Sequence, residues 1–308
     1  MPILRSIFIA LSTNSSLRQF MENSTLGVRM SSRFVAGKTV EDALTAAAAV
    51  NRHGMSCSLD SLGENVHSPQ EARQAADVYH RLLDAIEQRH LDANVSVKLT
   101  QMGMDLDPQL AFSLAEGLVE HAAAANTFVR LDMEGSDYTQ ATIDMVSKLH
   151  TGNENRGRVG VVIQAYLYRS QADVDRLLAE KIRVRLCKGA YQEPASLAFP
   201  EKADVDKNFV RLMQCLLPSG VYHGIATHDE QMIEATRRFA KERGIAADEF
   251  EFQMLYGVRR DLQKSLVASG YRVRVYIPFG TDWYPYFMRR LAERPANLFF
   301  IARNFFRN

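Results

Sequence analysis

Ionisable side chains occur at alternate positions of several short runs that are otherwise rich in Val, Ile and Leu. Lys98 has such a position in VSVKLT, Asp132 in FVRLDM, Arg185 in IRVRLC and Tyr276 in RVRVYI. A lysine, an arginine, a carboxylate and a phenol that share one site can bind an anion and stabilise charge that develops in a bound molecule. These four residues are our candidates for a reaction centre.

A second group of candidates follows two of the runs directly. Lys188-Gly189-Ala190 places a cation and a permissive glycine where backbone amides can approach phosphate oxygens. The lysine could equally form a Schiff base. Thr227-His228-Asp229 can supply a phosphate or ribose contact. A histidine in such a place is a metal ligand in many enzymes, but no second ligand is matched to it here, so we expect no metal.

Arg289 and Arg290 form an adjacent pair near the end of the sequence. Arginine binds a carboxylate with bidentate geometry, and Lys98 could add a further positive charge. Neighbouring helical residues point about 100° apart, so both arginines could reach one ligand only if the helix presents its flank. The alternative is a solvated helix face.

A scaffold must position these side chains. The sequence contains eight short predicted strands that alternate with longer amphipathic stretches. That alternation is typical of βα units and a parallel sheet. No GxGxxG turn indicates an open dinucleotide-binding sheet. We therefore predict an α/β fold, a closed TIM-type (β/α)₈ barrel. Its predicted strands are Met55–Asp60, Val95–Thr100, Phe128–Met133, Val159–Tyr166, Ile182–Cys187, Tyr222–Thr227, Phe250–Leu255 and Arg272–Ile277.

The polar side of these strands is predicted to face the barrel axis. Barrel interiors are usually filled with bulky branched side chains, so charges near the carboxyl ends of strands indicate a site that compensates their desolvation. The alternative is a set of structural ion pairs, for example Lys98 with Asp132 and Arg185 with Glu134. For Lys98, Asp132, Gln164, Arg185 and Tyr276 together, a functional site is the favoured interpretation.

Residues 1–50 are predicted to form helices that pack on the barrel of residues 51–308, with the whole chain as one domain. Ala43 to Ala49 is rich in alanine, and Ile3 to Leu11 lacks the features of a signal peptide, so we interpret it as a helix. Further helix starts are indicated by capping residues at Ser68, Asp229, and Thr281 or Asp282.

The composition favours a globular protein with a small-molecule partner. Its 37 basic and 36 acidic residues give a net charge of +1 among 308 residues, so no attraction to nucleic acid is implied. Three widely spaced cysteines fit a reducing cytoplasm. No apolar run approaches the roughly 20 residues that span a bilayer.

Seven segments resemble, in order and spacing, the motifs of the proline dehydrogenase family, monofunctional form. The resemblance spans Val95 to Asn297 and rests on SVKLTQMG, VRLDME, VVIQAYLY, VRLCKGAYQEP, IATHD, RVYIPFG and YFMRRLAERPAN. The ordered set, with a motif at the end of nearly every predicted strand, is specific even though each motif alone is weak.

The resemblance implies the first step of proline catabolism. In that reaction, FAD bound without covalent attachment takes a hydride at N5 from L-proline, the product is Δ1-pyrroline-5-carboxylate, and electrons pass to a quinone-type acceptor. An encounter with a membrane quinone implies a cytoplasmic enzyme that contacts the inner face of the membrane peripherally.

The resemblance also implies residue roles. The substrate residues are Lys98, Tyr276, Tyr286, Arg289 and Arg290. The catalytic residues are Asp132, Arg185 and Tyr276, with Arg185 beside flavin N5. The flavin residues are Asp132, Met133, Gln164, Arg185, Lys188, Gly189, Ala190, Thr227 and His228.

Two rival functions remain open at this point. One is a barrel lyase or aldolase that uses Lys188 or Lys98 as a Schiff base. The other is a non-catalytic barrel that binds a ligand as a sensor.

Overall fold

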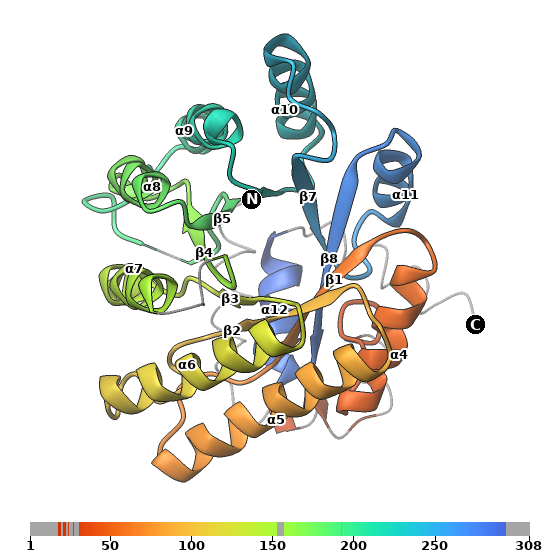
Figure 1. The fold of residues 1–308 in the computed structure, drawn as a ribbon, viewed down its shortest axis with the longest axis vertical. Coiled ribbons are helices and arrows are strands. Elements are labelled where there is room, and N and C mark those ends of the chain that lie inside the picture. Colours follow the sequence, from red (N-terminus) through yellow and green to blue (C-terminus); the bar gives the residue numbers. More distant parts are fainter. Residues whose placement is uncertain are drawn as a thin grey trace.

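The computed structural model is a closed barrel of eight parallel strands inside a ring of helices (Figure 1). It describes residues 31–152, 157–191 and 193–293 and the single positions 18, 19, 21, 22, 24 and 27, without the side chains of 289 and 291–293. Each strand pairs with the next, and β8 pairs with β1. The strands are β1 (Ser56–Ser61), β2 (Ala93–Val97), β3 (Val129–Leu131), β4 (Val159–Gln164), β5 (Arg183–Cys187), β6 (His223–Ala226), β7 (Phe250–Leu255) and β8 (Arg272–Phe279). The predicted (β/α)₈ barrel is confirmed.

Helices connect successive strands on the outside of the barrel, and among the described elements α4 precedes β1 and α12 follows β8 (Figure 1). They are α4 (Val40–Asn51), α5 (Pro69–Gln88), α6 (Pro108–Ala124), α7 (Ser136–Thr151), α8 (Ser170–Ala179), α9 (Lys202–Leu216) with the 3₁₀ turn η1 (Leu217–Ser219), α10 (Glu230–Arg243), α11 (Arg260–Ala268) and α12 (Trp283–Glu293).

Two of the predicted helix starts are confirmed by their caps. The Ser68 side chain accepts from the Glu71 amide and is followed by Pro69, and the Asp229 side chain accepts from the Gln231 amide. α12 begins directly after Asp282. The alanine-rich stretch lies in α4, whereas the predicted helix of residues 3–11 lies outside the described residues.

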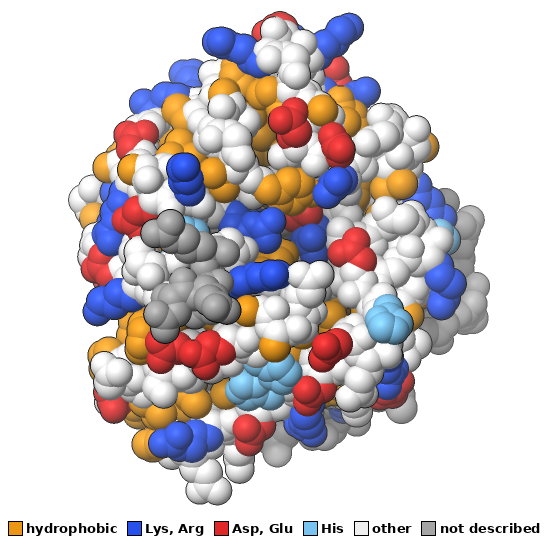
Figure 2. Space-filling view, in the orientation of Figure 1, with side chains coloured by type: hydrophobic (Ala, Val, Ile, Leu, Met, Phe, Trp, Pro, Cys, Tyr) orange, Lys and Arg blue, Asp and Glu red, His pale blue; other side chains and the backbone are white. Residues whose placement is uncertain are grey.

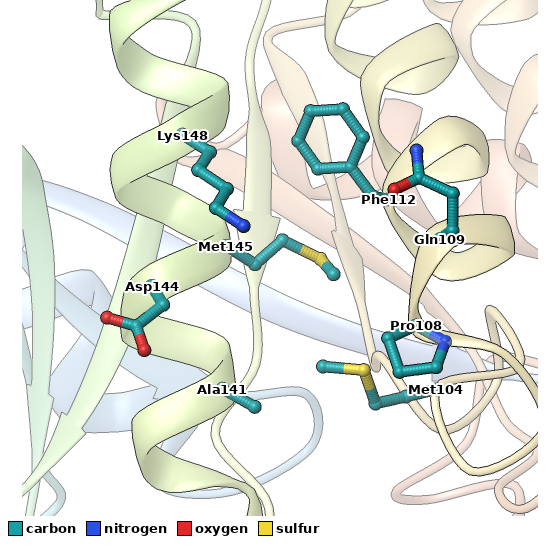
Figure 3. Close-up of a pocket in the computed structure, with 8 residues that line it drawn as sticks. All are labelled: Met104, Pro108, Gln109, Phe112, Ala141, Asp144, Met145 and Lys148. Carbon is teal, nitrogen blue, oxygen red and sulfur yellow. The ribbon is translucent and has the colours of Figure 1, made fainter.

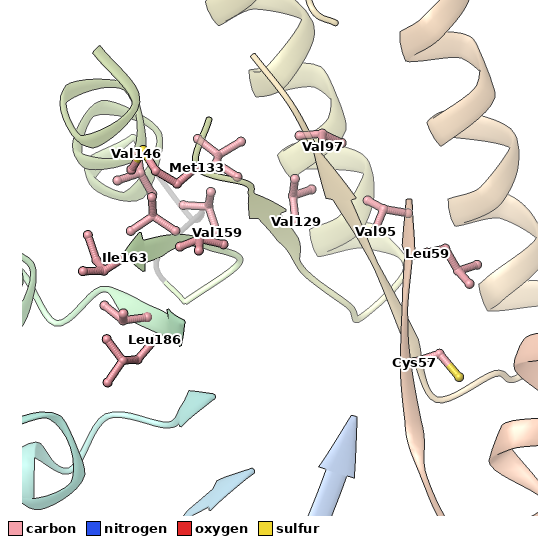
Figure 4. Close-up of a cluster of buried hydrophobic side chains, with 14 of the residues drawn as sticks. Cys57, Leu59, Val95, Val97, Val129, Met133, Val146, Val159, Ile163 and Leu186 are labelled. Carbon is pink, nitrogen blue, oxygen red and sulfur yellow. The ribbon is translucent and has the colours of Figure 1, made fainter. Parts of the chain in front are cut away.

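The hydrophobic core lies between the strands and the surrounding helices. Val95, Val97 and Val129 are fully buried there, as are Leu59 and, on the far side of the barrel, Leu186 (Figure 4). Burying one such side chain stabilises the fold by about 1.5–3 kcal/mol. The apolar side of the strands therefore faces the helices, as the alternation predicts.

The polar side of the strands faces the barrel axis. Arg185 on β5 donates to Ser58 on β1, at 3.2 Å, and Arg274 on β8 donates to Asn94 on β2, at 3.1 Å. Neither pair of strands is adjacent in the sheet, so these hydrogen bonds cross the interior. The prediction of a polar interior is confirmed.

Four strands end earlier than predicted, β2 at Val97, β3 at Leu131, β4 at Gln164 and β6 at Ala226. After β2 the chain turns at once, because the Met102 amide donates to the carbonyl oxygen of Lys98, at 3.3 Å. Lys98 and Asp132 consequently lie just beyond the ladders, in the segments that leave the carboxyl ends of the strands.

Candidate active site

A pocket of about 480 Å³ is formed at the carboxyl ends of the strands, where enzymes of this fold place their chemistry. Every predicted site residue lines it except Arg289, whose side chain lies outside the described residues. The predicted residues it brings together are Lys98, Asp132, Met133, Gln164, Arg185, Lys188, Gly189, Ala190, Thr227, His228, Tyr276, Tyr286 and Arg290.

The surface charge is distributed unevenly over the face that Figure 2 shows. Acidic and basic side chains are mixed around the rim, whereas Lys and Arg side chains gather near the middle, over the barrel of Figure 1. The net charge of +1 therefore coexists with a locally basic region at the barrel.

Several lining residues were not predicted from the sequence, among them Asp60 and Gln253. Asp60 lies near the end of β1, at an alternate polar position of SCSLDS, and Gln253 has an alternate polar position in FEFQML. The alternation rule that found Lys98 and Arg185 applies equally to these strands. The other residues not predicted for the site are Glu64, Val162, Cys187, Tyr191, Lys202, Ala226, Met254 and Leu255, whereas Asp229 belongs to the predicted Thr227-His228-Asp229 segment.

Lys98 and Asp60 form a buried ion pair, with Nζ 2.9 Å from Oδ1. Burial opposes the charge on Lys98, but the carboxylates of Asp60 and Asp132 raise its pKa well above the usual value. Burial also raises the pKa of Asp60, against the effect of Lys98. Lys98 is therefore a fixed positive charge at the pocket wall.

Arg185 is held on all sides by interior groups. Its Nη1 donates to Asp132, at 2.8 Å, and to Ser96, at 3.2 Å, while Nη2 donates to Ser58 and Nε to Gln253. The example ion pairs considered from the sequence, Lys98 with Asp132 and Arg185 with Glu134, are thus wrong. Alternation along a strand determines which side chains point inward, but the ion-pair partner of each depends on how the strands are placed relative to one another. Glu134 instead accepts from Thr100, at 2.6 Å.

Tyr276 completes this cluster from β8. Its hydroxyl donates to Oδ2 of Asp132, at 2.7 Å, and its ring centroid lies 5.1 Å from the Arg185 guanidinium carbon. Burial, with Asp132 and Asp60 nearby, raises the pKa of Tyr276 well above its usual value. Tyr276 is therefore a neutral donor, and Asp132 accepts from both the phenol and Arg185.

Tyr286 and Arg290 reach the pocket from successive turns of α12. The Arg290 guanidinium lies 5.0 Å from the Tyr286 ring centroid. Trp283 and Phe287 anchor the helix, because both are buried in an apolar cluster with Phe34 that also contains Tyr286. This packing explains how a helix with a polar flank is fixed over the pocket.

The turn after β5 is shaped by Gly189. Its φ of +111° is disfavoured for other residues, and a Cβ there would lie 2.2 Å from the Tyr166 ring. Lys188 is paired with Asp206, at 2.5 Å, and with Asp229, at 2.7 Å. The predicted phosphate-binding lysine thus has two carboxylate partners, which sequence spacing did not indicate.

His228 is oriented by the backbone of β7, because its Nε2 accepts from the Leu255 amide at 2.9 Å. An accepting nitrogen means that this side of the ring carries no proton. Within the part of the chain that the structure describes, no three His, Cys, Asp or Glu residues are grouped as metal ligands.

The Gln164 side chain presents a buried hydrogen-bond acceptor at the pocket wall. Gln164 is buried, and among the described residues nothing makes a hydrogen bond to its Oε1. A buried acceptor without a donor is costly, by about 1–3 kcal/mol, unless a ligand satisfies it.

A smaller hollow of about 280 Å³ lies outside the barrel, between α6 and α7 (Figure 3). Its walls are mainly side chains of these two helices rather than residues at the carboxyl ends of the strands. Its lining is Met104, Pro108, Gln109, Phe112, Ala141, Asp144, Met145 and Lys148. Asp144 already pairs with Arg176, at 2.7 Å, and no predicted site residue lies there.

Comparison with known proteins identifies the family. Residues 43–303 match the proline dehydrogenase family. The chain is 41% identical to proline dehydrogenase 1 of Bacillus subtilis (strain 168) over 303 residues, 98% of each chain. It is 43% identical to the proline dehydrogenase of Deinococcus radiodurans over 277 residues, 89% of each chain.

Among solved structures, proline utilization A from Bdellovibrio bacteriovorus aligns with a TM-score of 0.83 and 25% identity. The alignment covers 95% of this chain and 36% of that larger protein. The barrel, the pocket at its carboxyl end and these relatives together show that the chain belongs to the proline dehydrogenase family, oxidoreductases of proline catabolism.

Proposed function

We propose that the protein binds FAD in this pocket and oxidises L-proline to Δ1-pyrroline-5-carboxylate, passing the electrons on to a quinone. The observation that carries the proposal is the meeting of Lys98, Arg185, Asp132, Tyr276 and Arg290 around one cavity. Family membership sets aside the lyase and sensor alternatives. Lys98, held in its charged form, is also a poor nucleophile for a Schiff base.

The lining fits a flavin. Gln164 offers a buried acceptor for a ligand N–H, and the Gly189 turn lets backbone amides approach a phosphate. Lys188 lies at the wall beside this turn, paired with Asp206 and Asp229. When bound, the flavin supplies the hydride acceptor, its N5.

The side chains of this protein bind and orient the proline. Lys98 and Arg290, with Arg289 from the same helix, would hold its carboxylate by charge-assisted hydrogen bonds. Tyr276 and Tyr286 would wall its ring and exclude water. Arg185 would stabilise the negative charge that a two-electron reduction adds to the site.

The electron acceptor determines where the enzyme works. No helix among the described residues is long and apolar enough to cross a bilayer. The proposed quinone acceptor implies a cytoplasmic enzyme that meets the quinone by peripheral contact with the inner face of the membrane.

A steady-state assay tests the proposed reaction. Purified protein is mixed with L-proline and a soluble quinone. The product is trapped with an amino-substituted benzaldehyde, which forms a coloured adduct with pyrroline-5-carboxylate. We expect quinone reduction and trapped product in equal amounts. Quinone reduction without trapped product would contradict the proposal.

Gly189→Ala is expected to release the cofactor. An L-residue in this left-handed backbone costs about 1–2 kcal/mol, and the added methyl group would overlap the Tyr166 ring. The turn should shift away from the flavin and weaken its binding at least about tenfold, measured as the flavin content after dialysis. Gly220→Ala, also at positive φ but with open space around it, is the matched control. Equal flavin loss in both variants would contradict a specific role of the Gly189 turn.

Arg290→Ala is expected to weaken proline binding about tenfold or more while the flavin stays bound. The substitution leaves a buried carboxylate short of one charge-assisted partner. The apparent KM for proline measures the effect. Arg243→Ala on α10, whose arginine also lies over an aromatic ring, is the control. An unchanged KM would remove Arg290 from the substrate site.

A further inference from the structure

A chain of buried polar groups runs from the barrel interior to Arg185. Arg274 Nε donates to Glu251 Oε1, at 2.8 Å, Gln253 Nε2 donates to the same oxygen, and Gln253 Oε1 accepts from Arg185 Nε. Glu251 is 2% exposed and Gln253 is 4% exposed. Nothing in the predicted roles accounts for either residue.

The charge on Glu251 determines which groups donate and which accept along this series of hydrogen bonds. Burial opposes that charge, but Arg274 and its hydrogen bond lower the pKa of Glu251 below the usual value. Its other oxygen accepts from the Tyr222 hydroxyl, at 3.1 Å. An ionised carboxylate can only accept. The amide NH₂ of Gln253 must therefore face Glu251, and its oxygen must face Arg185.

The neighbouring strand leaves room for this amide. A Cβ at Gly224 on β6 would lie 2.3 Å from Nε2 and 2.7 Å from Cδ of Gln253. Gly224 thus creates the space in which Gln253 lies between Glu251 and Arg185.

The remaining contacts of Arg185 do not fix its plane as firmly. Asp132, Ser96 and Ser58 bind its two terminal nitrogens, whereas Gln253 alone among these partners binds Nε. A guanidinium held only at its terminal nitrogens can pivot about them. Anchoring Nε as well sets the orientation of the planar group toward the pocket.

We propose that Gln253 is a positioning residue for the oxidation, acting through Arg185, with Glu251 fixing the orientation of its amide. The inference rests on the proposed function, since it concerns how the Arg185 charge is presented to the flavin. Proline's own contacts, Lys98 and Arg290, are not part of this chain.

Gln253→Met keeps the side-chain length and removes both hydrogen bonds. We expect the rate of flavin reduction at saturating proline to fall about tenfold or more, with little change in the dissociation constant for proline. We also expect the midpoint potential of the bound flavin, titrated against a reference dye without proline, to fall. The second readout tests the inference even if proline proves not to be the substrate; failure of wild-type flavin to accept electrons from proline would count only against the proposed function.

Gln263→Met is the matched control. Gln263 is 3% exposed and donates to the carbonyl oxygens of Leu255, at 3.1 Å, and Val258, at 2.9 Å, outside the barrel interior. It should lose stability without changing the potential or the reduction rate. If both Met variants slowed reduction equally, Gln253 would be a structural residue only and the inference would be wrong.

Gln253→Glu gives a second, conservative variant. The new carboxyl can reproduce the amide only when it is protonated, because an O–H must then face Glu251. The midpoint potential and the reduction rate of the flavin in this variant should approach the wild-type values as the pH falls and decline from them as the pH rises. A pH profile parallel to that of wild type would overturn the inference.

Discussion

Arg185→Met is expected to slow proline-driven flavin reduction at saturating proline by about a hundredfold or more. The substitution removes a positive charge from a water-poor site, and losing one preorganised charge-stabilising donor typically costs about 10²–10³ in kcat. It should also lower the midpoint potential of the flavin, because the reduced form loses a neighbouring cation. Anaerobic rapid mixing and dye titration measure the two effects.

The ion pair in the structure adds a consequence for stability. Removing Arg185 leaves the Asp132 carboxylate, 9% exposed, without its cation, and breaking a buried pair in this way costs about 3–5 kcal/mol. Arg185→Met combined with Asp132→Asn should recover much of the unfolding free energy but not the reduction rate. If rate and stability recovered together, Arg185 would be a structural ion-pair residue only.

Lys98→Met is expected to weaken proline binding by at least about thirtyfold. It removes a charge that we assign to the proline carboxylate and leaves Asp60 as an unpaired negative charge at the same wall. The dissociation constant is measured from the proline dependence of flavin reduction. A normal dissociation constant would exclude Lys98 from the carboxylate site.

The same variant should show a distinct pH dependence of stability. Burial already raises the pKa of Asp60, and losing Lys98 removes the largest influence that lowers this pKa. The folded state then holds a proton that the unfolded state releases, so stability falls as the pH rises between the unfolded and folded pKa values. The stability deficit relative to wild type should be smallest in acid. Lys98→Met with Asp60→Asn should remove this dependence; a deficit that grew in acid would contradict it.

Much of the scaffold could be predicted because two simple periodicities specify it. Each of the eight predicted strands overlaps an observed one, since short apolar runs with alternating polar residues have few other stable arrangements in a βα chain. The first strand was predicted from pattern alone, and β1 occupies that position. The same alternation placed Lys98, Arg185 and Tyr276 in one pocket.

Partner choice inside the barrel could not be predicted in the same way. Asp132, which follows β3, pairs with Arg185 on β5, two strands along the barrel, rather than with Lys98, which follows the neighbouring β2. Asp60 and Gln253 have the same alternation signal, yet their roles appear only when the Lys98 and Arg185 contacts are known. Local sequence carries no information on such long-range contacts.

Two predictions concern residues near the ends of the chain. The helix expected at residues 3–11 and the side chain of Arg289 lie outside the described residues, so both remain predictions. The contribution of the second arginine is best isolated by comparing Arg289→Ala with Arg290→Ala for proline affinity.

The most direct test of the proposed reaction is a single anaerobic experiment. The protein is purified with its bound chromophore, and its visible spectrum is followed by rapid mixing with L-proline in the absence of any other electron acceptor. We expect flavin bands that bleach in one turnover and return when a quinone is added. A flavin that dithionite bleaches but saturating L-proline leaves fully oxidised would contradict the proposal that proline is oxidised in this pocket.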